Sequence, residues 1–140
     1  MQRAALTVVA YIAATFAVQA TSHFGINAEH YARLGYLRAE PIVPMGFASM
    51  IVQGLVMAWL YPRLEGAGRS LWHALRFAWL MGAFLVSYIA LAEAGKYAVP
   101  AIGPWIAVEV VAGFLQYTLF GLLLGLIHRR AAQRAMAAGG

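Results

Sequence analysis

The sequence predicts an all-α membrane protein: one domain, residues 1–140, built as an antiparallel bundle of four transmembrane helices with a short interfacial helix between helices 1 and 2. Hydrophobic residues make up 63% of the chain and charged residues only 11%, whereas about a quarter of a soluble domain is charged. Four apolar runs each reach the roughly 20 residues that a helix needs to cross about 30 Å of hydrocarbon. They show no alternation with a period of two, so membrane-spanning strands are not predicted.

The four runs cover about residues 4–22, 44–62, 71–92 and 104–128. Pro41 precedes the second run and Pro44 begins it, and proline is compatible with the start of a helix. The connection at residues 64–70, "LEGAGRS", is short and rich in glycine, which predicts a tight hairpin between helices 2 and 3.

The connection between helices 1 and 2 is longer, "TSHFGINAEHYARLGYLRAEPIVP". Asn27 is a residue type that caps helices, so we expect a short helix to begin there. In that helix Tyr31 and Leu34 would lie along the headgroup plane, while Glu29 and Arg33 would face water.

The basic residues predict the orientation of the chain. The positive-inside rule places both termini in the cytoplasm, because seven basic residues then lie inside and three outside. The inner ones are Arg3, Arg63, Arg69, Arg76, Arg129, Arg130 and Arg134, and the outer ones are Arg33, Arg38 and Lys96. The net charge of +5 does not indicate nucleic-acid binding, since the basic residues gather at the ends of apolar runs, where lipid headgroups are the expected partners.

Polar residues recur in the predicted outer half of every helix. Glu109, Gln116 and Phe120 follow one helical face at i, i+7 and i+11, and Ser49 and Gln53 are i, i+4 neighbours. An unpaired polar group facing lipid costs several kcal/mol, so we expect these faces to turn inward and form a pocket that opens outward. Its candidate ligand-binding residues are Glu109, Gln116, Gln53, Gln19, Ser49 and Tyr88. They either bind a ligand, as ionisable groups inside a membrane often do, or only link helices by hydrogen bonds.

The four histidines offer two weaker alternatives. His23 and His30 are weak candidates for a metal site at the outer mouth, although their spacing in a loop is a poor signal. His73 and His128 lie near the inner ends of helices 3 and 4 and are weak candidates for haem ligands. The main expectation is that the protein holds no metal and no cofactor.

Small residues follow the faces of helices 2 and 4, where they allow two helices to approach closely. The pattern "GLLLG" at residues 121–125 is one example. Such a face packs either within one chain or against a second chain, as in a homo-oligomer or a larger membrane complex. The candidate packing residues are Gly54, Ala58, Gly113, Gly121 and Gly125.

The sequence carries no signature of an enzyme: serine-hydrolase, zinc-protease, nucleotide-loop and dinucleotide patterns are all missing. The chain also has no Asp and no Cys, which leaves little for paired-carboxylate or thiol chemistry. We therefore predict no catalytic residues.

The stretches "HYARLGYLRAEPIVPMGF", "QGLVMAWLYPRLEG", "ALRFAWLMGAFLVSYIALAEAGKY" and "LQYTLFGLLLGLIHR" resemble small four-helix bacterial membrane proteins of unknown function. The resemblance covers about two thirds of the chain, from residue 30 to 129. It implies a four-helix fold in the bacterial inner membrane and transfers no activity.

Three functions follow from these observations as expectations. The first is a non-catalytic structural or accessory subunit of a membrane assembly, suggested by the small-residue faces. The second is a carrier or binder of a small lipophilic or cationic ligand, with Glu109 at its centre. The third is a haem-binding membrane protein.

Overall fold

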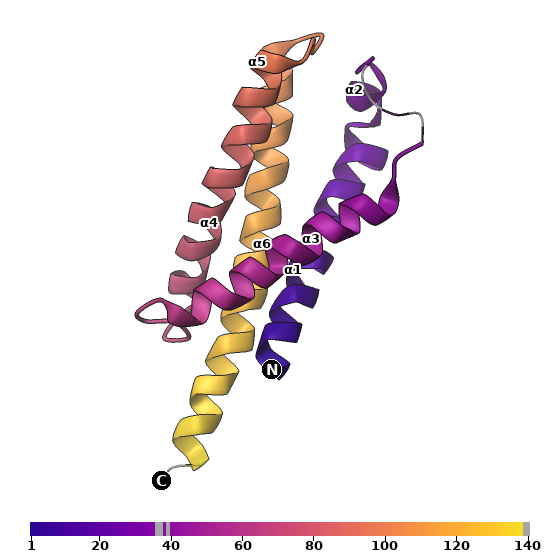
Figure 1. The fold of residues 1–140 in the computed structure, drawn as a ribbon. Coiled ribbons are helices and arrows are strands. Elements are labelled where there is room, and N and C mark those ends of the chain that lie inside the picture. Colours follow the sequence, from indigo (N-terminus) through magenta and orange to yellow (C-terminus); the bar gives the residue numbers. More distant parts are fainter. Residues whose placement is uncertain (36–37, 39, 139–140) are drawn as a thin grey trace.

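The computed structural model describes residues 1–138 except 36, 37 and 39, and this part of the chain is helical without a strand (Figure 1). Four segments are long and apolar enough to cross a membrane, which confirms the predicted number of spanning helices. They are Gln2–Ile26, Val43–Arg63, Leu71–Lys96 and Ile102–Arg129. Each of these segments contains its predicted apolar run and extends beyond it by at most four residues at either end.

Short segments continue several of the long helices. α1 (Gln2–Thr21) runs through a π-helical turn, η1 (Ser22–Ile26), into α2 (Ala28–Ala32). α3 (Val43–Leu60) ends in a 3₁₀ turn, η2 (Tyr61–Arg63). α4 (Leu71–Ser87) passes through a second π-helical turn, η3 (Tyr88–Glu93), into α5 (Ala94–Lys96), and α6 (Ile102–Ala138) completes the chain.

α6 is the central helix, and it packs against α4 on one side and α1 on the other. Its glycines make the contact with α4 close: a Cβ at Gly121 would lie 3.0 Å from the Cβ of Ala78, and one at Gly125 would lie 2.6 Å from Leu71 Cδ2. Gly113 meets Val86 in the same way. The predicted packing residues of the last helix are therefore used inside the chain.

α3 does not lie alongside α4 as a regular hairpin would place it. It packs on α1 and crosses it obliquely (Figure 1). Gly54 allows the crossing, because a Cβ there would lie 3.2 Å from Val8 Cα, and Ala58, which is buried, follows it one turn later. Close contact at a small residue favours such oblique crossings in membranes, so the expected regular bundle gives way to a crossed arrangement.

Ring contacts trace the path of α3. Near its beginning Phe47 stacks on Phe16 of α1, and at its end Tyr61 packs against Phe77 of α4 and His128 of α6. α3 thus starts beside α1 and finishes over α4 and α6 at the end of the molecule opposite α2 and α5. At the end of the molecule where α2 and α5 lie, α3 does not cover α4 and α6 (Figure 1).

The predicted interfacial helix is short and packs inward. The side chain of Asn27 does not cap α2; its amide donates to Ser22 Oγ at 2.9 Å. Tyr31 and Leu34 are buried in a cluster with Ala94 and Trp105, instead of lying along a headgroup plane. Glu29 and Arg33 are exposed and form an ion pair, as their predicted position requires.

The connection between η2 and α4 is a tight loop. Gly66 and Gly68 have φ values of +83° and +81°, a region that glycine adopts without strain. The N–H of Gly68 donates to the hydroxyl of Tyr61 at 3.3 Å, so the loop closes over the end of α3.

Candidate functional site

Polar side chains of α1 recur on every turn of the face that meets α6. Thr7, Tyr11, Thr15 and Gln19 are spaced four residues apart, which puts them in one row. Each of the four has a polar partner on α3 or α6. We call the contact between this row and α6 the polar seam.

The middle of the polar seam is centred on Tyr11, which is fully buried. Its hydroxyl donates to Gln53 Oε1 and lies 3.1 Å from the hydroxyl of Tyr117. Gln53 Nε2 in turn donates to Ser49 Oγ at 2.9 Å. Three helices are joined at this point, so Gln53 and Ser49 act here as links between and along helices.

About two turns beyond Tyr11 on α1, Gln19 meets Gln116 of α6. Gln19 Nε2 donates to Gln116 Oε1 at 2.7 Å, and Gln116 Nε2 donates to Thr15 Oγ1 at 3.0 Å. Both ends of the Gln116 amide are therefore occupied. Gln19 differs, because its Oε1 is buried and has no hydrogen-bond partner among the described residues.

Glu109 faces inward, as predicted, and only 6% of its surface is exposed. The hydroxyl of Tyr31 donates to Glu109 Oε1 at 2.7 Å. Glu109 lies seven residues before Gln116 on α6, about 10 Å along the helix axis. It therefore forms a separate group beyond the polar seam, and does not join the glutamines in one cluster as the sequence suggested.

Aromatic rings surround the bond between Tyr31 and Glu109. The imidazole of His23 stacks on the ring of Tyr31, with centroids 3.7 Å apart, and the ring of His30 lies edge-on to Tyr31 at 5.4 Å. Trp105 packs against His30 and Tyr31 and donates its indole N–H to the carbonyl of Ile89 at 3.3 Å. This contact fixes Trp105 to η3.

The positions of these residues depend on irregular helix geometry. η1 carries His23 and leads into α2, which carries His30 and Tyr31, and η3 ends at Glu93. π-helical turns are rare in proteins and frequently occur at functional sites. Glu93 lies close enough to Glu109 for the two charges to interact.

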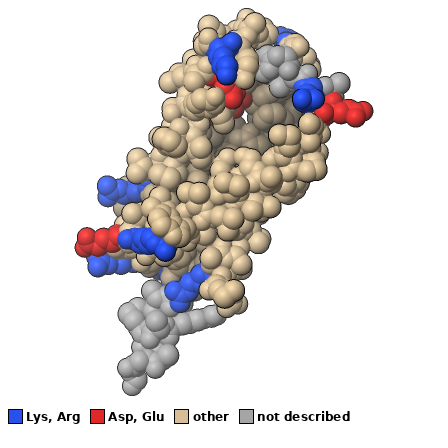
Figure 2. All heavy atoms as spheres, viewed as in Figure 1, with Lys and Arg blue, Asp and Glu red and all other residues tan. Residues whose placement is uncertain are grey.

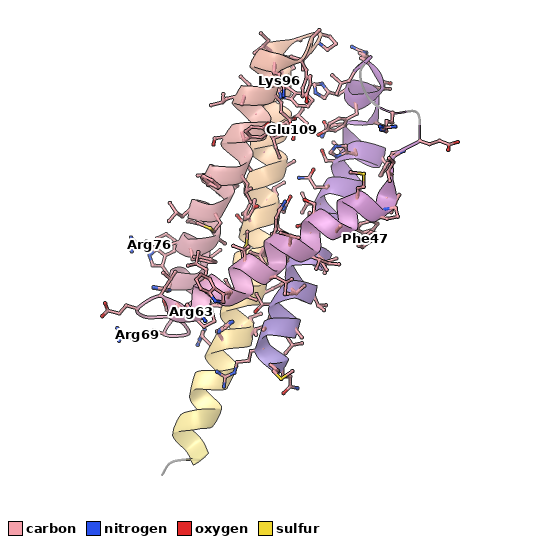
Figure 3. All side chains as sticks on the ribbon, in the orientation of Figure 1. Phe47, Arg63, Arg69, Arg76, Lys96 and Glu109 are labelled. Carbon is pink, nitrogen blue, oxygen red and sulfur yellow. The ribbon has the colours of Figure 1, made fainter. Side chains whose placement is uncertain are left out.

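A hollow opens beside this group. Figure 2, viewed as in Figure 1, shows it at the end of the molecule where α2 and α5 lie, between the pair α4 and α6 and the pair α1 and α3. An acidic side chain is visible at its edge. Figure 3 places Glu109 and Lys96 at this end of the molecule. The oblique path of α3 explains the hollow, because α3 covers the polar seam at Gln53 and leaves this end open. We call Glu109, Tyr31, His23, His30 and Trp105 the aromatic–acidic site.

One predicted pocket residue, Tyr88, is largely exposed. It belongs to η3, and 58% of its surface is accessible. The π-helical turn that begins at Tyr88 changes the direction in which the residues of this segment point, and an ideal helix does not predict that change.

The histidine alternatives gain no support from the geometry. Within the described part of the chain, no group of three or more His, Asp and Glu side chains is placed to hold a metal ion. The rings of His73 and His128 both lie near the ring of Tyr61, at centroid distances of 6.0 and 4.9 Å. Tyr61 is fully buried.

Sequence reasoning missed the tyrosines and threonines of the site. Tyr11, Thr15 and Tyr117 complete the polar seam, and Tyr31 is the partner of Glu109. A polar residue recurs at every fourth position from Thr7 to Gln19, and this pattern could have predicted the roles of Tyr11 and Thr15. Nothing comparable marks Tyr31, because its position depends on the fold of η1 and α2.

No family model, curated protein or solved structure matches this chain.

Proposed function

We propose that this protein binds, and as a carrier could move, a small organic cation with an apolar part in the aromatic–acidic site. The observation that carries the proposal is the buried carboxylate of Glu109, held by Tyr31 beside a hollow and surrounded by aromatic rings. The glutamines of the polar seam serve mainly to hold the helices that form the site.

The chemistry of the site suits a cation. Cations are attracted to the faces of aromatic rings, and more strongly where water is excluded. A carboxylate in a low-dielectric site gains more from an opposite charge than one in water does. Glu93 adds a second acidic group nearby, so an anion would be repelled.

The proposed setting is the bacterial inner membrane with both termini in the cytoplasm. The basic residues favour this orientation, and the hollow then opens toward the outside, where a ligand would enter.

Pentylamine is a suitable probe, because it combines an ammonium group with an apolar tail. Its binding to the protein purified in a mild detergent can be measured by equilibrium dialysis. We expect saturable binding to the wild type and at least a tenfold weaker affinity in Glu109→Gln, a loss of about 1.4 kcal/mol or more.

Glu65→Gln is the matched control, since Glu65 is exposed in the loop at the opposite end. It should bind as the wild type does. A wild type without saturable binding, or a Glu109→Gln variant with unchanged affinity, would refute the proposed function.

A role as a structural or accessory subunit is the second candidate. It is favoured by the first part of α3, where residues 43–49 are all exposed although Phe47 stacks on Phe16 of α1. A partner helix would cover this stretch. Native mass spectrometry from a mild detergent tests the idea: a monomer that carries no co-purified protein would count against it.

A further inference from the structure

We infer that the ligand carries two N–H donor groups, a charged one for Glu109 and a second one for Gln19 Oε1, so that a diamine is preferred over a monoamine or a quaternary ammonium ion. This inference rests on the proposed function. It adds a second recognition point, at the junction of the aromatic–acidic site and the polar seam.

Gln19 supplies the second point because one end of its amide is unused. Its Nε2 is bonded to Gln116, whereas its Oε1 is buried without a partner among the described residues. A buried acceptor that lacks a donor is destabilising, and most such atoms in proteins are satisfied. A ligand group that supplies an N–H to this oxygen would remove the deficit.

Gln19 is connected to Glu109 by a continuous series of contacts. His23 Nδ1 lies 3.0 Å from the carbonyl oxygen of Gln19, and the imidazole stacks on Tyr31. Tyr31 in turn donates to Glu109 at 2.7 Å. Gln19 and Glu109 therefore lie at the two ends of a series of contacts that passes through the rings of His23 and Tyr31.

Both ends of the predicted ligand must donate, because both protein groups accept. A quaternary ammonium ion has no N–H, so it would gain from the carboxylate and the rings but would leave Gln19 Oε1 unpaired. A monoamine would satisfy Glu109 alone. The preference for a diamine can therefore be measured on the wild-type protein, by comparing the affinities of diamines, a monoamine and a quaternary ammonium ion.

The test is equilibrium dialysis of the purified chain with 1,5-diaminopentane, 1,4-diaminobutane, pentylamine and tetramethylammonium. We expect the better diamine to bind at least tenfold more tightly than pentylamine. In Gln19→Leu this ratio should fall below twofold.

The outcomes separate the two proposals. Equal affinity of the wild type for diamines and pentylamine, or a diamine preference that persists in Gln19→Leu, would overturn the inference and leave cation binding at Glu109 standing. If no amine binds the wild type, the proposed function itself fails. The ligand series measured on the wild type keeps the inference testable even if Gln19→Leu does not fold.

Discussion

At the scale of single residues, Tyr11 holds the most connected position. It is fully buried and joins α1 to Gln53 of α3 and Tyr117 of α6 through one hydroxyl group. Inside a membrane no water can replace such a partner, so a lost hydroxyl leaves its neighbours unsatisfied. Tyr11 is therefore expected to matter for stability more than for ligand binding.

Tyr11→Phe should lower the free energy of unfolding by about 1–3 kcal/mol, the usual range when a buried polar group loses its partner. Titration with sodium dodecyl sulfate, followed by tryptophan fluorescence, measures the change. Tyr88→Phe is the matched control: it removes the same atom from an exposed residue and should shift stability by about 0.5 kcal/mol or less. Equal effects of the two substitutions would contradict the role given to Tyr11.

At the scale of helices, the contact between α4 and α6 depends on residues without side chains. Gly121 lies against Leu75 and Ala78, with the nearest of these atoms 3.0 Å from the position of an added Cβ. Without a hydrophobic driving force between helices in lipid, such close packing is a main source of their association.

Gly121→Val should force α4 and α6 apart and lower the free energy of unfolding by about 1–3 kcal/mol, as overpacking does. The same detergent titration measures it. Gly103→Val makes the same change at a helical glycine where an added Cβ meets nothing within 4 Å, and it should have a much smaller effect. The close approach of the two helices would be unimportant if Gly121→Val were as stable as Gly103→Val.

At the scale of the whole molecule, the orientation in the membrane can be tested directly, because the chain has no native cysteine. A cysteine at Ser70 should react with a membrane-impermeant maleimide only after the cells are opened. A cysteine at Ala98 should react in intact cells. The reverse pattern would place the hollow on the cytoplasmic side and change the direction from which a ligand enters.

The sequence was sufficient for the number of spanning helices, and for their ends to within about four residues, because the length of an apolar run is a local property. It also predicted that Glu109 and Gln116 face inward, since polar groups are costly in lipid. The partner of Glu109 was not predictable, because Tyr31 reaches it only through η1 and α2. The crossing of α3 likewise depends on the contact of Gly54 with Val8, which joins distant parts of the chain.

The oblique path of α3 also bears on the lipid around the protein. α3 and η2 together have 21 residues, a length of about 32 Å, whereas the apolar part of α6 has 28 residues, about 42 Å. A tilted short helix reaches across less of a bilayer than a long one, so we expect the acyl chains beside α3 to compress. We predict that this hydrophobic mismatch, confined to the flank beside α3, gives the protein a preference for thinner bilayers.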